Sequence, residues 1–178
     1  VTLGCKVNQY DTQSIRERFL KGGYKEIYNG MPADICLIDT CTVTAVADRK
    51  SRNAIRNCIR ENPRAKIIVT GCLVEKDALA LDEIRGVDFV ISKKFFPAGI
   101  SNFCAHTRAF LKIQDGCDNF CSYCKVPLAR GRSRSRDLGE IISETQQLVK
   151  NGFREIVLCG ICLGAYGRDL PNRISLID

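Results

Sequence analysis

Residues 34–70 read DICLIDTCTVTAVADRKSRNAIRNCIRENPRAKIIVT, and this stretch determines the fold class. The apolar run at 34–39 is typical of a buried strand, and the pattern from Val46 to Arg60 is typical of a helix. Pro63 lies in the following turn, and the run at 66–70 is a second buried strand. A strand, a helix and a strand in this order predict a parallel βαβ unit.

The same alternation extends on both sides of this unit. Upstream, a β-prone run at 1–4 precedes a helical pattern at 10–20, which the glycine pair 22–23 ends. Downstream, a helical pattern at 73–84 precedes a strand pattern at 87–91. The sequence therefore predicts an α/β fold with a parallel, Rossmann-like sheet.

We expect two domains. The first spans residues 1–95, and residues 96–106 form a linker because they lack periodicity and contain proline and glycine. The alternation restarts in residues 107–178, with a strand at 109–113, a helix at 138–151 capped by Asp137, and a strand at 155–159. A single βαβ unit cannot bury both faces of its sheet, so the second domain is expected to be exposed, unstable and part of a longer protein.

Composition excludes several classes of protein. The 178 residues are 45% hydrophobic and 26% charged, which is typical of a globular protein and too apolar for a disordered one. No apolar run approaches the roughly 20 residues of a membrane helix. Val1 already lies in a strand-like pattern, so no secretory signal is visible and the true start is expected to be missing. The net charge of +7 indicates an anionic partner.

The cysteine content indicates metal or redox chemistry. The chain has 11 cysteines and one histidine, His106. An odd count and long α/β periodicity argue against a complete disulfide framework, so a cytoplasmic location with reduced thiols is expected. Cysteine at this density in a cytosolic protein indicates metal or redox chemistry more often than packing.

Three cysteines share one context although they lie far apart in the sequence. Cys5, Cys41 and Cys72 each directly follow a predicted strand. Parallel strand ends meet at one edge of a sheet, where open α/β sheets bind their ligands. These residues are expected either to hold a metal or iron–sulfur cluster or to be buried for packing. Cys36 and Cys58, inside a strand and a helix, are expected to be core residues.

A second cysteine group is local. Cys117, Cys121 and Cys124 form a C-x3-C-x2-C loop directly after a predicted strand. Zinc sites generally need four ligands, usually from C-x2-C pairs, and ferredoxins use C-x2-C-x2-C with a fourth cysteine. Three thiolates on a four-iron cluster leave one iron open, so the spacing favours a catalytic cluster over zinc. Tyr123 is expected either to pack against a planar ligand group there or only to cover the loop.

Basic residues follow this loop in a dense run of Arg130, Arg132, Arg134 and Arg136. The run is either a solvated loop or, beside a catalytic cluster, a contact for substrate phosphates. A second basic set occupies the 46–60 helix and the turn after it, namely Arg49, Lys50, Arg52, Arg56, Arg60, Arg64 and Lys66. With the overall charge, nucleic acid is the favoured partner, and RNA is favoured over DNA because RNA loops splay their bases outward.

These motifs resemble a known enzyme family. A C-x3-C-x2-C loop with an aromatic residue before its last cysteine is similar to the radical S-adenosylmethionine superfamily. The strings KIQDGC at 112–117, RGRSRSR at 130–136 and TLGCKVNQY at 2–10 are more specific. Together they resemble the methylthiotransferases, in particular the bacterial type that modifies threonylcarbamoyladenosine at position 37 of tRNA, next to the anticodon.

The resemblance implies two [4Fe-4S] clusters. The auxiliary cluster would bind Cys5, Cys41 and Cys72 in the N-terminal domain. The second would bind Cys117, Cys121 and Cys124, at the start of a radical S-adenosylmethionine (β/α) partial barrel.

The same resemblance implies the reaction and its partners. A methylthio group is added to carbon 2 of the adenine through a 5′-deoxyadenosyl radical, with sulfur from the auxiliary cluster and methyl from a second S-adenosylmethionine. The partners implied are the tRNA anticodon loop and a reductant such as flavodoxin or ferredoxin, with neither membrane nor DNA. A C-terminal RNA-binding domain normally follows in the family, so this chain is expected to be truncated and inactive alone.

One segment departs from the family pattern. Residues 159–165 read CGICLGA, where the family has a Thr-Gly-Ile-His-Leu-Gly-Ser-like segment. Two of the three changes introduce cysteine, Cys159 and Cys162, which puts local packing and S-adenosylmethionine contacts in doubt. Three alternatives stay open: a methylthiotransferase acting on a protein such as a ribosomal aspartate, a non-catalytic metal or electron-transfer protein, and an inactive truncated product.

Overall fold

The computed structural model describes residues 1–27, 31–96, 98–103 and 107–177. The helices are α1 (Lys6–Lys21), α2 (Ala45–Glu61), α3 (Cys72–Asp82), α4 (Val126–Arg130) and α5 (Leu138–Lys150), with 3-10 turns η1 (Lys93–Phe95) and η2 (Leu163–Ala165). The strands are β1 (Ile35–Thr40), β2 (Lys66–Gly71), β3 (Phe89–Val90), β4 (Ala109–Lys112), β5 (Gln114–Asp115), β6 (Arg134–Ser135) and β7 (Ile156–Cys159).

The first sheet confirms the predicted parallel α/β fold. Its strand order is β1-β2-β3, all parallel, and Thr40 pairs with Gly71 at the carboxyl ends of β1 and β2. Ile38, Val69 and Leu73 are fully buried in its core. The predicted strand at 1–4 is wrong as a full strand, because only Thr2 forms a bridge, parallel to Asp39.

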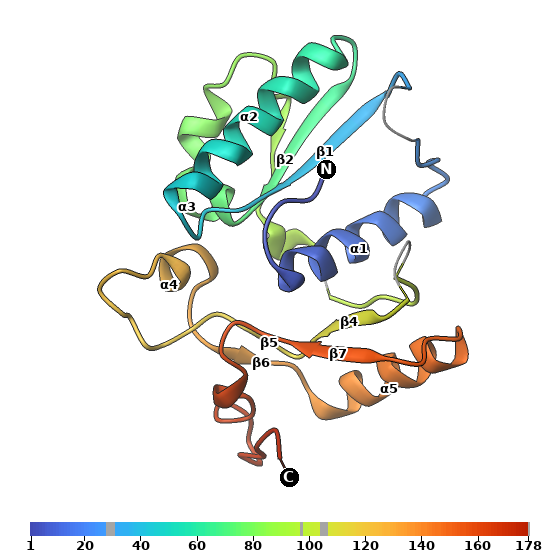
Figure 1. Ribbon diagram of the computed structural model, residues 1–178, viewed down its shortest axis with the longest axis vertical. Coiled ribbons are helices and arrows are strands. Elements are labelled where there is room, and N and C mark those ends of the chain that lie inside the picture. Colours follow the sequence, from blue (N-terminus) through green and yellow to red (C-terminus); the bar gives the residue numbers. More distant parts are fainter. Residues whose placement is uncertain (28–30, 97, 104–106, 178) are drawn as a thin grey trace.

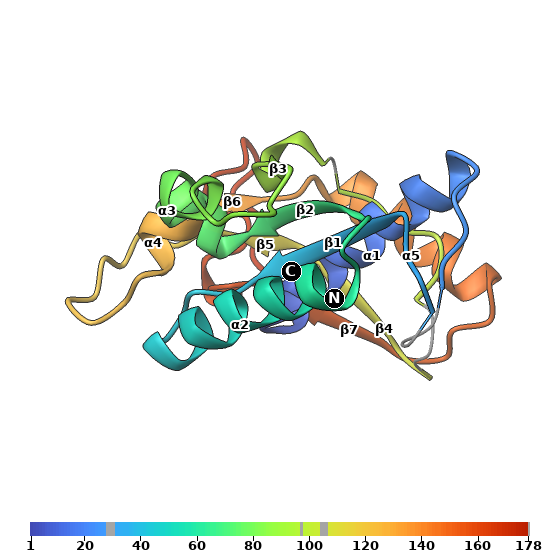
Figure 2. The ribbon, with the colours of Figure 1, turned by 90° about the horizontal axis from the view of Figure 1, so that it is seen from above.

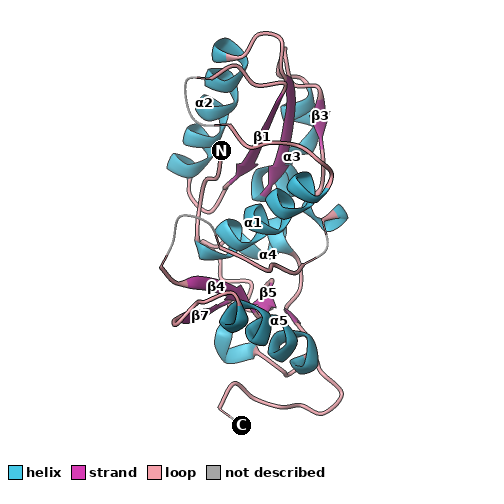
Figure 3. Cartoon of the chain, turned by 90° about the vertical axis from the view of Figure 1, so that its right-hand side faces the viewer, coloured by secondary structure: helices cyan, strands magenta, loops and turns pink. Residues whose placement is uncertain are grey.

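The second sheet is smaller and also parallel, consisting of β4 and β7. α5 covers one face of it and α1 covers the other, so α1 lies between the two sheets in Figures 1 and 3. Val7 and Tyr10 on α1 share one core with Phe110 and Leu111 on β4. The expectation that this sheet would be exposed is therefore wrong, because an N-terminal helix supplies its second layer.

The segment that joins the two sheets, around residues 98–103, packs on α1 and α5. Ile100 and Phe103 are buried in the shared core. Three of its backbone amides have carboxylate partners: that of Ile100 donates to Glu144, and those of Ser101 and Asn102 donate to Glu17. Parts of the expected linker, Cys104 and His106 among them, lie outside the described residues.

Element boundaries differ from expectation in three places. α1 begins at Lys6, one turn before the predicted start, and Cys5 is its N-cap residue. β3 is only two residues long. The cysteine loop contains α4 and is closed by an antiparallel β5–β6 pair, visible beside α4 in Figures 1 and 2. Asp137 caps α5 as predicted, accepting a bond from the Gly139 amide at 2.8 Å.

Within the described ranges, no helix is both long and apolar enough to cross a membrane.

Candidate metal centre

The fold brings the three strand-end cysteines to one edge of the first sheet. Because Thr40 pairs with Gly71, Cys41 and Cys72 lie just beyond neighbouring strand ends. Cys5 joins them from the start of α1. A Cβ atom at Gly4 would lie 3.1 Å from the Cys41 sulfur, so the backbone before Cys5 packs directly on Cys41.

Asn8 holds these three segments together. Its side-chain amide donates to the carbonyls of Leu3 and Thr40, each at 2.9 Å. Its Oδ1 accepts from the Cys72 thiol at 3.5 Å. The residue is 1% exposed. Asn8 was not among the predicted site residues. The feature that could have indicated it is a polar side chain next to Val7, which is buried on the same helix turn.

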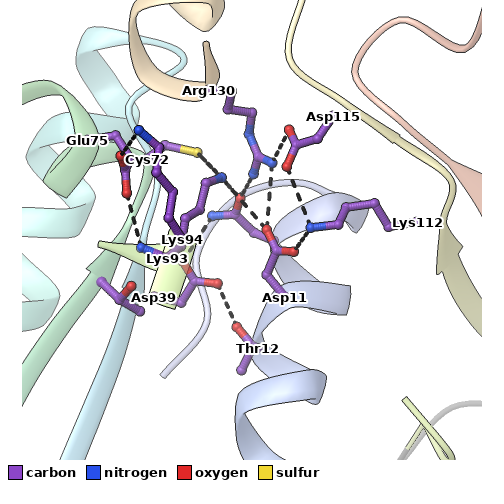
Figure 4. A network of polar contacts seen from close by, with 12 residues as sticks. Asp11, Thr12, Asp39, Cys72, Glu75, Lys93, Lys94, Lys112, Asp115 and Arg130 are labelled. Atoms are coloured by element: carbon purple, nitrogen blue, oxygen red, sulfur yellow. Dashed lines mark hydrogen bonds and ion pairs between the residues drawn. The ribbon is translucent and has the colours of Figure 1, made fainter. Parts of the chain in front are cut away.

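A buried charge network adjoins the Cys72 thiol (Figure 4). Arg130 contacts Asp115 at 2.8 Å and Asp11 at 3.6 Å, and its second terminal nitrogen donates to Asn8. Lys112 also bridges Asp11 and Asp115. Arg130 thus connects α4, on the second cysteine loop, with α1 of the first domain.

Lys93, in η1, extends this network to the sulfur. Its Nζ lies 3.7 Å from the Cys72 sulfur and 3.7 Å from an Asp11 carboxylate oxygen. A cavity of about 440 Å³ borders Lys93 and Arg130 on the side of β6.

Burial and the neighbouring charges shift the pKa values of three groups in this region. It raises the pKa of the Cys72 thiol, and the nearby Lys93 and Arg130 oppose that rise. Burial, with the Asp11 carboxylate, raises the pKa of Asp39 to about 7. Burial also acts on Asp115, but the Arg130 guanidinium and neighbouring lysines hold its pKa well below the ordinary value.

The residues at this edge fit an iron–sulfur cluster in donor chemistry. All three donors are thiols, the ligands that iron–sulfur clusters take. If Cys72 gave up its proton to become a ligand, the Asn8 Oδ1 would lose that donor but keep Arg130 as another.

Among the described residues, no three histidine, cysteine or carboxylate side chains converge closely enough for one metal ion. A four-iron cluster spreads its thiolates wider than one ion does, so cluster ligation by either cysteine group stays a prediction.

The second cysteine group lies at the surface. Cys121 is exposed, and Cys117 and Cys124 are half-buried. The Cys117 amide donates to the Gly131 carbonyl at 3.1 Å, and the Cys124 amide to the Cys121 carbonyl at 2.9 Å. Tyr123 is 87% exposed, so its ring is available to a ligand.

The second loop is docked on the first domain. α4 packs against α3. Lys125, directly after Cys124, lies 3.6 Å from Asp48 of α2. Together with Arg130, these contacts pack the segment that follows the second cysteine group against the first domain.

The structure corrects the predicted RNA contact for two of the four arginines. The Arg130 side chain is 2% exposed, and its guanidinium donates to Asp115 and Asn8. Arg136 pairs with Glu144 at 2.7 Å and donates to the Tyr10 hydroxyl at 2.9 Å. Both are interior residues that join the domains.

The other two arginines of the run face solvent. Arg132 stacks on the Phe120 ring at 4.9 Å, and its side chain is 74% exposed. Arg134 is also exposed. Their contact with phosphates stays a prediction, as does that of the exposed basic residues of α2.

The remaining cysteines are mostly interior. Cys58 is buried and Cys36 half-buried in the first core, in line with packing. Cys159 ends β7 in the second core, where burial raises the pKa of its thiol to about 12. Cys162 is half-buried, and nothing in the structure explains the replacement of the usual family residue there.

Comparison with known proteins gives one family match. The family described as "Uncharacterized protein family UPF0004" matches residues 1–92, slightly more than half of the chain.

Curated relatives match almost the whole chain. The threonylcarbamoyladenosine tRNA methylthiotransferase MtaB of Bacillus subtilis (strain 168) is 42% identical over 201 residues, covering 96% of this chain and 45% of that protein. The protein of the same name from Chlamydia pneumoniae is 41% identical, covering 100% and 47%. A tRNA-2-methylthio-N(6)-dimethylallyladenosine synthase of Dehalococcoides mccartyi (strain ATCC BAA-2266 / KCTC 15142 / 195) is 35% identical, covering 99% and 45%. The chain spans about half the length of these relatives.

Proposed function

This chain belongs to the uncharacterized protein family UPF0004, and from that premise we propose that it is part of a radical S-adenosylmethionine methylthiotransferase that modifies tRNA. Its similarity to proteins with such names over 96% of its length supports the proposal. The relatives named here act on tRNA by name, which favours tRNA over a ribosomal protein as substrate.

One observation carries the proposal: Arg130 links the segments that carry the two cysteine groups, because its guanidinium donates to both Asn8 and Asp115. Asp115 lies two residues before Cys117, and Asn8 contacts the Cys72 thiol. Adding sulfur to an unactivated carbon needs a radical source and a sulfur source near one substrate atom. Contacts between the two segments support that arrangement.

The residues of the chain have distinct roles in this proposal. Cys117, Cys121 and Cys124 hold a [4Fe-4S] cluster and leave one of its irons open. Tyr123, exposed beside it, packs on S-adenosylmethionine. Cys5, Cys41 and Cys72 would hold a second [4Fe-4S] cluster, with Asn8 in contact with the Cys72 sulfur. When bound, the two clusters supply an electron for S-adenosylmethionine cleavage and the sulfur.

Within tRNA, the specific target in this proposal is the adenosine at position 37, in the anticodon loop. We favour threonylcarbamoyladenosine over dimethylallyladenosine because relatives of the first kind reach 42% identity, against 35% for the synthase compared here. The exposure of Arg132 and Arg134 supports a role in contacting the RNA backbone. A reductant such as flavodoxin or ferredoxin and a cytoplasmic location complete the proposal.

Domain boundaries at 1–95, 96–106 and 107–178 are part of the same proposal. The family match over residues 1–92 supports the first boundary. The shared core around α1 means that the domains pack as one unit despite that division.

The test is whether S-adenosylmethionine binds an open iron on the second loop. The chain carrying Cys5→Ala, Cys41→Ala and Cys72→Ala is reconstituted anaerobically, reduced with dithionite and examined by electron paramagnetic resonance. We expect S-adenosylmethionine to change the spectrum, whereas adenosine, which lacks the chelating amino and carboxylate groups, leaves it unchanged. A cluster whose spectrum ignores S-adenosylmethionine would contradict the proposal.

A further inference from the structure

The Cys72 sulfur faces a lysine ammonium that no sequence motif indicates. Lys93 follows β3, outside both cysteine groups, and its Nζ lies 3.7 Å from this sulfur (Figure 4). Its side chain is 13% exposed, so solvent screens its charge only weakly. Arg130 is linked to the same sulfur indirectly, because it donates to the Asn8 oxygen that also accepts from the Cys72 thiol.

The positive charge of Lys93 is incompletely neutralised. Among the described residues, its ion-pair partner is Asp11, at 3.7 Å. Asp11 is shared with Lys112, which contacts its other oxygen, and with Arg130 at 3.6 Å. Asp115 pairs with Lys112 and Arg130 instead. Of these three cations, Lys93 contacts the sulfur, and its carboxylate partner is more distant than those of Lys112 and Arg130.

We propose that Lys93, supported by Arg130, raises the reduction potential of the iron–sulfur cluster that Cys72 ligates. The inference rests on the proposed function, which assigns a cluster to Cys5, Cys41 and Cys72. Reduction adds one electron, and therefore one negative charge, to the cluster. A buried cation beside a ligating sulfur stabilises that extra charge, because net charge, sulfur contacts and solvent exposure set the potential of such clusters.

The test isolates this cluster and measures its potential. In the chain carrying Cys117→Ala, Cys121→Ala and Cys124→Ala, only the first cysteine group can assemble a cluster. Dithionite supplies the electron, and electron paramagnetic resonance follows the reduced form against a set of redox mediators. The variants are Lys93→Met, Lys93→Arg and, as a matched control, Lys94→Met, whose side chain is the exposed neighbour at 70%.

We expect Lys93→Met to lower the ratio of reduced to oxidised cluster about tenfold at a fixed potential, equivalent to about 59 mV for a one-electron couple. Lys93→Arg, which keeps the charge, and Lys94→Met, which removes a screened one, should each change the ratio less than about twofold. If Lys93→Met fails to hold its iron, Lys93→Gln gives the same measurement and is expected to show the same fall, because it retains a donor but no charge.

The outcomes separate the two proposals. If the chain that carries only Cys117→Ala, Cys121→Ala and Cys124→Ala assembles no cluster, this contradicts the assignment of the first cysteine group and with it the proposed function. A cluster that assembles with an unchanged potential in the neutral Lys93 variants overturns the inference alone. An equal fall in Lys94→Met also overturns it, since the effect would then not come from the charge at the sulfur.

Discussion

The two cysteine groups are built in opposite ways. Cys5, Cys41 and Cys72 come from three separate elements and meet only when α1 packs against the ends of β1 and β2. The second group lies within residues 117–124, on one loop that a short strand pair closes. Cys41 and Cys72 are buried, with Cys72 beside buried charges, whereas Cys5 of the first group and Cys121 of the second are exposed.

This difference shows which contacts each group depends on. The first group depends on tertiary packing, so damage to α1 should remove it while the loop persists. The second group depends on the local path of its own loop, so damage there should spare the first group.

The largest effect is expected at Gly116, directly before Cys117. Its φ is +73°, and an added Cβ would lie 1.9 Å from the Arg132 carbonyl oxygen. Gly116→Ala should therefore cost about 4 kcal/mol of unfolding free energy and abolish cluster assembly on the second loop. Chemical denaturation and iron analysis of the chain measure both effects.

Gly131→Ala is the matched control for this change. Gly131 has a similar φ of +76°, but nothing lies within 4 Å of an added Cβ. It should cost about 2 kcal/mol, from backbone strain alone, because its φ of +76° with ψ of −161° is a region that glycine almost alone adopts. Equal losses for the two variants would show that the close approach to Arg132 is irrelevant.

The next effect is expected for Asn8→Ala. The change leaves the buried Thr40 carbonyl without its amide donor and Arg130 without one acceptor. We expect a loss of about 3 kcal/mol and of the iron bound to the first group, with the second group unaffected. Gln9→Ala, on the same helix turn, serves as the control. A variant that kept both clusters would refute the central role of Asn8.

A smaller effect is expected for Tyr10→Phe, which tests the docking of α1 on the second sheet. The Tyr10 hydroxyl donates to Glu144 at 2.8 Å and accepts from the Gly99 amide at 2.9 Å. Its loss should cost about 1.5 kcal/mol, while Tyr24→Phe, at a residue that is 54% exposed, should cost almost nothing.

The wild-type chain should unfold in a single transition, because α1 is shared by both sheets. Two separate transitions, with Tyr10→Phe shifting neither, would mean that the domains are independent.

The smallest effect on stability is expected for Arg132→Gln combined with Arg134→Gln. Both side chains are exposed, so the unfolding free energy should change by less than about 0.5 kcal/mol. Affinity for a tRNA anticodon stem-loop should fall several-fold, with a shallower salt dependence, because two phosphate contacts are lost. Unchanged affinity at low salt would show that these arginines belong to a solvated loop and do not contact the RNA.

The fold was predictable where the pattern is local. Buried strands such as 66–70 and the capped helix after Asp137 follow from apolar runs and capping residues. The packing of α1 on β4 was not predictable, because residues 6–21 are mostly polar and their buried face includes Asn8 and Glu17. Those side chains are buried by partners more than 30 residues away, which no local pattern reveals.

The same limit applies to the site. The second cysteine loop is visible in the spacing alone, and the first group was suggested by the rule for parallel strand ends. Arg130 and Arg136 were predicted as RNA contacts because the arginine run follows a candidate catalytic cluster in a chain of net charge +7. Their burial follows from Asp115 and Glu144, whose positions only the three-dimensional fold gives.

The most direct test of two separate cluster sites is iron and acid-labile sulfide content after anaerobic reconstitution. It compares the wild-type chain with the two triple variants: Cys5→Ala, Cys41→Ala, Cys72→Ala and Cys117→Ala, Cys121→Ala, Cys124→Ala. We predict about eight irons for the wild type and about four for each variant. About four irons in the wild type, lost entirely with the second group and unchanged without the first, would mean that Cys5, Cys41 and Cys72 serve packing and hold no cluster.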